Sequence, residues 1–203
     1  MAGLRALLAQ DIDIYLRFAS AYHDVPPGFK RRLGALLTPS LLACLLHRCA
    51  HGLHERGWRR LGLLVSLANL WLTRVSIHPA SRIGGGLYIP HPGSSIVFQG
   101  HAGINLCLYS GAAVFAAPGT PLHHASPGAM PRLGDNVSLG SKACIRGPVT
   151  IGSEVKLGFN ARVETDLPDG AVVFAARVRN RVRPRAGAET PGCDPGLPAL
   201  PPH

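Results

Sequence analysis

The chain has 203 residues, and its 21 Lys and Arg outnumber its 11 Asp and Glu, giving a formal charge of +10 at pH 7. This length suits one ordinary domain with an accessory segment, and a hydrophobic content of 46% is enough for a buried core. The basic balance favours an anionic partner: nucleic acid, a membrane surface or a phosphorylated small molecule. The five cysteines include no Cys-x-x-Cys pair, and no secretory leader is recognisable. We therefore expect free thiols and a cytoplasmic protein.

Residues 1–75 are expected to form an α-helical N-terminal segment. An amphipathic beginning is interrupted at 26–28 by Pro-Pro-Gly, and Thr38 followed by Pro39 has the form of a helix N-cap. The longest apolar run, 61–72, has about a dozen residues. A helix that spans a membrane needs roughly 20, so we predict no transmembrane segment.

The sequence from 76 to 178 loses helical periodicity and acquires a period of six. The step is seven from Ile89 to Ile96 and nineteen from Val114 to Leu133, which marks two insertions. The aliphatic positions of the repeat are Ile77, Ile83, Ile89, Ile96, Ala102, Leu108, Val114, Leu133, Leu139, Ile145, Ile151, Leu157 and Val163.

A short, fixed period predicts a solenoid. Each group of six residues would form a short strand and a turn, and three groups would complete one triangular coil. The aliphatic side chains would point inward, where each buried one contributes about 1.5–3 kcal/mol. Residues 179–203 are basic and rich in Pro and Gly, and we expect this tail to be disordered.

Two segments of the repeat, VSIHPASRIGGGLYIPHPGSSIVF and PRLGDNVSLGSKACIRGPVTIGSEVKLGFNARVETDLPDGAVV, resemble the hexapeptide-repeat acyltransferases. The likeness is greatest to the serine acetyltransferases and their sugar O-acetyltransferase relatives, and its most specific part is IHPASRIGGGLYIPH. It implies a mainly β fold, a left-handed parallel β-helix after the helical segment. It further implies a homotrimer that binds acetyl-CoA between adjacent subunits. We expect no metal, because the histidines of the repeat do not have the spacing of a zinc site.

The resemblance also implies that His91 is the general base. An aliphatic hydroxyl is a poor nucleophile until a positioned base takes its proton. In serine acetyltransferases an Asp fifteen residues before the base orients it, and here that position is Ser76. A substrate-binding Asp directly before the base is replaced by Pro90, and a second histidine by Met130.

The remaining predicted site residues fall into two groups. Arg177 and Arg179 begin an alternating arginine strip that is suited to the phosphates of coenzyme A. The alternative roles of this strip are binding of nucleic acid and a solvated tail without a ligand. We predict no nucleic-acid partner, because no binding motif accompanies the strip. The predicted acceptor-binding residues are His78, Pro90, His123 and His124, and the other predicted cofactor-binding residues are Ala116, Gly140 and Gly158.

A second group of histidines, His47, His51 and His54, shares one face of the helix expected after Thr38. A metal site is possible at this spacing, but a polar stripe on a packed helix is preferred. The helices of residues 38–72 are expected to pack on the trimer end or to pair two trimers. Peripheral contact with a membrane through the basic sequence RGWRR is the less favoured alternative.

The sequence thus predicts a coenzyme A-dependent O-acetyltransferase that acts on the hydroxyl of serine or a serine-like small molecule. A sugar or other metabolite hydroxyl is an alternative acceptor, and a catalytically degenerate scaffold is the alternative outside the enzymes. No Asp or Glu occurs between Glu55 and Asp135. An ammonium group is normally met by a carboxylate, so this window favours an acceptor without a free ammonium.

Overall fold

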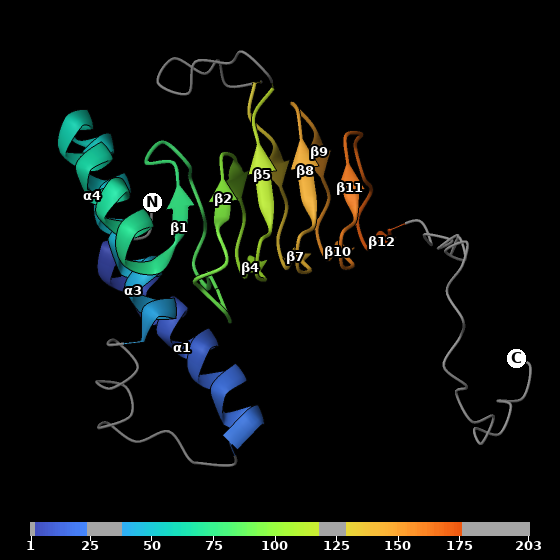
Figure 1. Cartoon of the computed structure of the whole chain (residues 1–203), viewed down its shortest axis with the longest axis horizontal. Coiled ribbons are helices and arrows are strands. Elements are labelled where there is room, and N and C mark those ends of the chain that lie inside the picture. Colours follow the sequence, from blue (N-terminus) through green and yellow to red (C-terminus); the bar gives the residue numbers. More distant parts are fainter. Residues whose placement is uncertain (1–2, 24–37, 118–128, 176–203) are drawn as a thin grey trace, which may run out of the picture.

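The computed structural model describes residues 3–23, 38–117 and 129–175. Within these ranges three helices precede twelve short strands (Figure 1). The helices are α1 (Leu4–His23), α3 (Pro39–Glu55) and α4 (Arg59–Thr73), and they lie at one end of the stack of strands. No helix in the described ranges combines the length and apolar character needed to cross a bilayer.

The strands form three parallel sheets, which the chain visits in rotation. Each circuit therefore stacks on the one before, and we call residues 75–173 the β-coil. The first sheet contains β1 (Val75–Ile77), β2 (Ile96–Phe98), β5 (Ala113–Phe115), β8 (Cys144–Arg146) and β11 (Arg162–Val163); the second contains β3 (His101–Ala102), β6 (Arg132–Leu133) and β9 (Thr150–Ile151); the third contains β4 (Cys107–Leu108), β7 (Ser138–Leu139), β10 (Lys156–Leu157) and β12 (Val172–Val173).

The interior of the β-coil is built from the predicted aliphatic repeat. Each predicted position except Ala102, which is partly buried, is fully or almost fully buried. A second layer, which the six-residue pattern did not identify, lies two positions before the first. It includes Val75, Leu87, Leu106, Ala112, Val137, Ala143, Val149, Val155 and Ala161.

The phase of the repeat was wrong at one place. Strand pairing stacks Phe98, and not Ile96, on Ile77, and Val114 then stacks on Phe98. Phe98 follows Ile89 by nine residues, so this corner has three residues beyond the regular six, where the sequence indicated one. The error arose because Ile96 and Phe98 are both completely buried and both fit an aliphatic or aromatic inward position.

The helices are attached to the first circuit by side chains that reach backbone carbonyls. Ser40 Oγ near the start of α3 donates to the carbonyl of Ile89, and Ser66 Oγ on α4 donates to that of Ile77 at 2.9 Å. The predicted cap of α3 is present, with Thr38 Oγ1 accepting from Leu41 N at 3.5 Å. The helices thus close the first end of the β-coil.

A buried ion pair joins α1, α3 and the first circuit. Arg48 donates from Nε and Nη2 to the two carboxylate oxygens of Asp11, both at 3.0 Å, and both side chains are almost completely buried. Asp11 Oδ1 also accepts from the backbone N–H groups of Gly86 and Leu87, at 2.9 and 2.8 Å. Arg48 donates further to the carbonyls of Ile83 and Gly84. The carboxylate of Asp11 and the guanidinium of Arg48 therefore both bind the backbone of residues 83–87.

His47, beside this ion pair, is fully buried. Neither ring nitrogen has a hydrogen-bond partner in the described chain, and the ring stacks near that of His51 with centroids 6.1 Å apart. Burial is the main reason that the pKa of His47 lies well below its usual range, and the charge of Arg48 lowers this pKa further. His47 is therefore a neutral core residue.

Replacing Asp11 with Asn should leave the buried guanidinium of Arg48 without its counter-charge. We expect the free energy of unfolding, measured in urea by circular dichroism, to fall by about 3–5 kcal/mol. Asp13→Asn, two residues away on the exposed side of α1, is the matched control and should cost about 1 kcal/mol or less. Equal effects of the two variants would contradict a dominant role for the buried pair.

His47 should make the fold sensitive to acid. The unfolded chain protonates this residue below about pH 6.5, whereas the folded chain, with its lowered pKa, does not. The free energy of unfolding should therefore fall as the pH drops below that value, with a slope of at most about 1.4 kcal/mol per pH unit from this residue. His47→Leu should lose this part of the slope in denaturant titrations between pH 5 and about 7.5; an unchanged slope would contradict the assignment.

Candidate active site

His91 lies in the loop 90–95, where the chain passes from the third sheet back to the first. This is the corner that carries the three extra residues. The turns 109–112, 140–143 and 158–161 of the later circuits stack beneath it in one column, which we call the His91 corner. His91 is exposed, and Ser110 Oγ from the next circuit donates to its backbone carbonyl at 3.2 Å.

The base of the loop is fixed by the helices. Tyr88, three residues before His91, stacks on Phe18 of α1 with ring centroids 4.5 Å apart and planes 8° from parallel. Tyr15, one turn earlier on α1, lies 6.3 Å from Tyr88 between centroids. Together with the hydrogen bond from Ser40 to Ile89, these contacts hold the strand that leads into the loop. A rigid support of this kind is what a general base requires.

The His91 corner contains no acidic residue in any circuit, and it contains Lys142. The carboxylates of Asp135 and Asp169 lie at a different corner, between the second and third sheets, where they accept from backbone N–H groups of Ile104 and Ser153 at 2.8 and 2.6 Å. The stretch 56–134, which lacks Asp and Glu in the sequence, therefore contributes to a corner of the structure that lacks carboxylates as well. A carboxylate near His91 has to come from another element or from another chain.

The structure brings some of the predicted site residues together. Pro90, Gly140 and Gly158 share the His91 corner, and Ser76 lies beside it on the outer face of β1. No hydrogen bond joins the side chains of Ser76 and His91. His78 follows β1 and Ala116 follows β5, so both lie at the opposite edge of the first sheet.

Close packing between circuits explains why positions 140 and 158 are glycines. A Cβ on Gly140 would come within 2.7 Å of the Leu157 carbonyl oxygen in the next circuit, and one on Gly158 would meet the ring of Phe174 at 3.0 Å. Their role in binding a cofactor stays a prediction. His123, His124, Arg177 and Arg179 lie outside the described residues, as does the tail 179–203.

Ser110 and Lys142 were not identified as site residues from the sequence. Ser110 follows His91 by nineteen residues, and Lys142 adopts a left-handed backbone conformation (φ 59°) in the turn of the circuit after that. The signal that was available is circuit spacing, because Ile89, Leu108, Leu139 and Leu157 occupy the same place in successive circuits and each is followed by one of these turns. The shift from Ile96 to Phe98 changes the inward position within one strand and leaves this column of turns in place.

Three cysteines are poor candidates for a covalent intermediate. Burial raises the pKa of Cys107 to about 11, and it raises those of Cys44 and Cys144 above their ordinary value. These thiols stay protonated near neutral pH, and the thiol is a weak nucleophile compared with the thiolate. The described environment of these three thiols therefore does not favour a covalent cysteine intermediate.

A groove of about 900 Å³ lies elsewhere, between α1, α3 and the first two circuits. Its walls include Leu7, His51, Arg82 and Ile104, and none of the predicted site residues lines it. His51 is held there by a 2.8 Å contact between its Nδ1 and the carbonyl of Pro79. No group of three His, Cys, Asp or Glu side chains is arranged to hold a metal ion within residues 3–23, 38–117 and 129–175.

No protein-family model matches the chain. Serine acetyltransferase of Helicobacter pylori is 30% identical to it over 151 residues, which are 74% of this chain and 85% of that protein. Serine acetyltransferase of Mycobacterium tuberculosis is 32% identical over 138 residues, 66% of this chain and 57% of that longer protein.

Solved structures have the same architecture. The soybean serine acetyltransferase apoenzyme matches with a TM-score of 0.69 at 27% identity, over 87% of this chain and 68% of that chain. The Neisseria gonorrhoeae enzyme in complex with serine matches with a TM-score of 0.68 at 24% identity, over 87% and 68%; a likeness at that identity concerns the fold alone. The Entamoeba histolytica isoform 3 structure with cysteine matches with a TM-score of 0.69 at 24% identity, and this chain spans 61% of it.

Together with these relatives, the stacked circuits and the exposed histidine of the corner loop define an acyltransferase. The chain belongs to the serine acetyltransferase family, since it covers most of the Helicobacter pylori relative at 30% identity. The family resemblance found in the sequence is thereby confirmed.

Proposed function

We propose that this chain transfers the acetyl group of acetyl-CoA to the hydroxyl of L-serine, with His91 as general base. The observation that carries the proposal is the 30% identity over 85% of a protein named serine acetyltransferase. The sugar alternative is not favoured, because the relatives described above carry the name of the serine enzyme. A degenerate scaffold is not favoured either, because His91 is exposed on a supported loop.

In the proposed reaction, an imidazole nitrogen of His91 takes the proton of the serine hydroxyl as its oxygen attacks the thioester carbonyl. The C–S bond then breaks, and the proton passes from His91 to the leaving coenzyme A thiolate. The products are O-acetylserine and coenzyme A, and no electrons or further reactants are needed. The general base contributes about 10²–10⁴-fold to the rate of such a step.

We further propose that the β-coil is a left-handed parallel β-helix within a homotrimer and that the acetyl-CoA site lies between adjacent chains. The acid-free His91 corner supports a shared site, because the ammonium group of serine requires a carboxylate from outside this corner. The domain limits 1–75, 76–178 and 179–203 belong to the same proposal. The described free thiols of Cys44, Cys49, Cys107 and Cys144 support a cytoplasmic location.

The roles of individual residues around His91 remain proposals. Ser76, on the outer face of β1 beside the corner, is proposed to orient the imidazole once substrates are bound. Pro90, His78, His123 and His124 are proposed to contact the acceptor. Ala116, Gly140, Gly158, Arg177 and Arg179 are proposed to contact coenzyme A, the arginines through its phosphates.

The acceptor is tested by measuring thiol release from acetyl-CoA with matched hydroxyl compounds. L-serine should give a kcat/KM at least about tenfold above that of ammonium-free analogues and of sugars, because a site built for a charged group rejects acceptors that lack it. This reverses the expectation drawn from the acid-free window. If ammonium-free hydroxyl compounds match serine, the acceptor assignment fails while the transferase assignment stands.

His91→Ala should lower the rate with serine by about 10²–10⁴-fold and leave the affinity for coenzyme A, measured by calorimetry, unchanged. The fold should be retained, because His91 is exposed and outside the stacked layers. His54→Ala, near the end of α3 and far along the chain from the corner, is the matched control and should keep the wild-type rate. A His91 variant with more than about a tenth of the wild-type rate rejects this residue as the base.

A further inference from the structure

Helix α4 presents an apolar face that nothing in the described chain covers. The exposed side chains on it and at its N-cap are large: Trp58 is 61% exposed, Leu61 42%, Leu63 46%, Leu64 59%, Leu67 52%, Trp71 76% and Leu72 66%. One side of α4, with Gly62, Asn69 and Thr73, is buried against α3 and the first circuit. The opposite side faces away from the β-coil, at the closed end of the molecule (Figure 1). Exposed apolar areas of this kind mark interaction sites.

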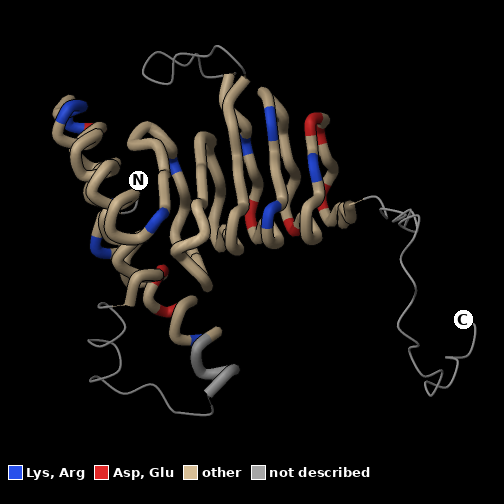
Figure 2. The backbone as a smooth tube through the Cα atoms, in the orientation of Figure 1, with Lys and Arg blue, Asp and Glu red and all other residues tan. Residues whose placement is uncertain are grey.

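The charges on α4 and at its two ends are positive, and the neighbouring Glu55 at the end of α3 is paired with Arg82. Arg56 and Arg59 stand at the first end of α4, Arg60 lies on the face itself, and Arg74 follows the last turn. No carboxylate in the described chain forms an ion pair with any of these four arginines. The absence of Asp and Glu from 56 to 134 means that α4 and the first circuits provide none. Figure 2 shows that, apart from Glu55 at the end of α3, the described acidic residues lie on α1 and on the later circuits.

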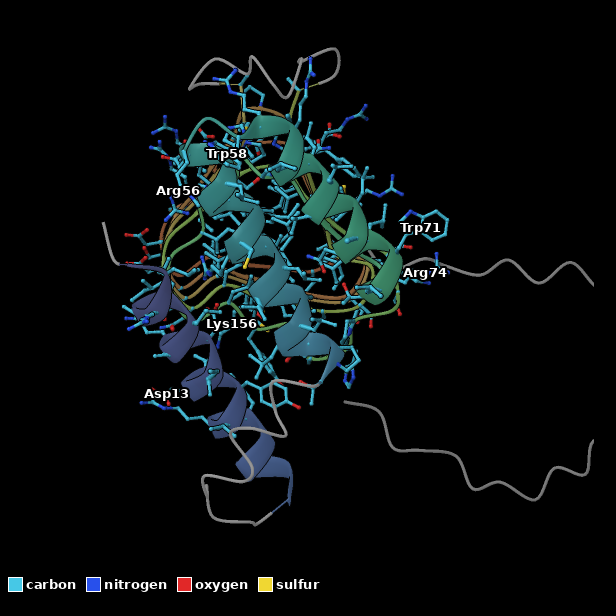
Figure 3. The ribbon with its side chains drawn as sticks, turned by 90° about the vertical axis from the view of Figure 1, so that its left-hand side faces the viewer. Asp13, Arg56, Trp58, Trp71, Arg74 and Lys156 are labelled. Carbon is cyan, nitrogen blue, oxygen red and sulfur yellow. The ribbon has the colours of Figure 1, made fainter. Side chains whose placement is uncertain are left out.

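The two tryptophans of the chain, Trp58 and Trp71, both belong to this surface. Figure 3 looks onto the helices and shows Trp58 with Arg56 near the beginning of α4, and Trp71 with Arg74 projecting at its end. Thirteen residues separate the tryptophans, which is about 20 Å along a helix. Trp at the ends of an apolar helical face with Arg beside it is the composition of helices that lie in a membrane interface.

A second copy of this chain fits the surface less well in an end-to-end contact, in which the face meets itself. Such a contact would bring Arg56, Arg59, Arg60 and Arg74 against their own equivalents, and the acid next to them in sequence, Glu55, is already paired with Arg82. Like charges placed across an interface disfavour association. An anionic lipid surface offers the opposite sign, and it can accept the leucines and tryptophans into the headgroup boundary.

We propose that the exposed face of α4, from Trp58 to Arg74, docks on the surface of a bilayer that contains anionic lipid. The helix lies in the plane of the interface, with Leu64, Leu67 and Trp71 toward the acyl chains and the arginines at the level of the lipid phosphates. The contact is peripheral, in agreement with the absence of a spanning helix from the described residues. It is independent of acetyl transfer, because the His91 corner belongs to a different part of the first circuits.

The test uses the intrinsic fluorescence of the full chain, since both tryptophans report on this face. Addition of vesicles made of equal parts phosphatidylglycerol and phosphatidylcholine should shift the tryptophan emission to shorter wavelength, and the chain should float with the vesicles. Vesicles of phosphatidylcholine alone should bind much more weakly, and added salt should reduce binding to the anionic vesicles.

Two pairs of variants locate the contact. Leu64→Ser with Leu67→Ser should weaken partitioning to anionic vesicles by about tenfold or more. Arg59→Gln with Arg60→Gln should do so by a similar factor. The matched controls are Phe159→Ser with Phe174→Ser, at the far end of the β-coil where these rings are 71% and 76% exposed, and Arg146→Gln with Arg162→Gln. Neither control pair should change binding.

Three results would overturn the proposal. The first is an unchanged emission spectrum in the presence of anionic vesicles. The second is flotation without a spectral shift, which would mean that the basic residues beyond 176 hold the chain to the lipid. The third is a smaller sedimentation coefficient for the Leu64 and Leu67 variant with unchanged vesicle binding, which would make the face a contact between copies of this chain.

Discussion

The arrangement of this protein depends on the buried pair of Asp11 and Arg48. The two charges neutralise each other, and both also bind the backbone between Ile83 and Leu87. A single contact therefore sets α1, α3 and the first circuit in position. Burying two ions has a large desolvation cost, which is offset only when the geometry satisfies most of their hydrogen-bonding groups. The geometry here meets that condition, because four backbone groups bind the pair in addition to the two bonds within it.

The position of the loop that carries His91 follows from this attachment. With α1 held by Asp11, its next turns bring Tyr15 and Phe18 onto Tyr88, immediately before the loop of His91. With α3 held by Arg48, Ser40 reaches the carbonyl of Ile89. The helical segment thus has a role beyond closing the end of the β-coil, since it supports the strand from which the proposed base projects.

Much of the β-coil could be predicted from its sequence, because each inward position selects one aliphatic residue every six. The phase at Ile96 and Phe98 could not, since two buried residues in one short strand satisfy the same pattern. The ion pair could not be predicted from the sequence either, because Asp11 and Arg48 are 37 residues apart and neither belongs to a recognisable local pattern. His91 was predicted from its motif and its role stays a prediction, whereas the contact of Ser110 with its carbonyl and the place of Lys142 in the same corner were seen only in the stacked turns.

The three extra residues of the His91 corner are partly offset by a short next step. Ala102 follows Phe98 by four positions, where six are regular, so one extra residue remains between the paired positions Ile83 and Ala102. Since each circuit of such a stack contacts only its neighbours, a change in loop length here is absorbed locally. A change in the length of the His91 loop can therefore alter this corner, while the order of stacked side chains from Leu133 to Val163 stays the same.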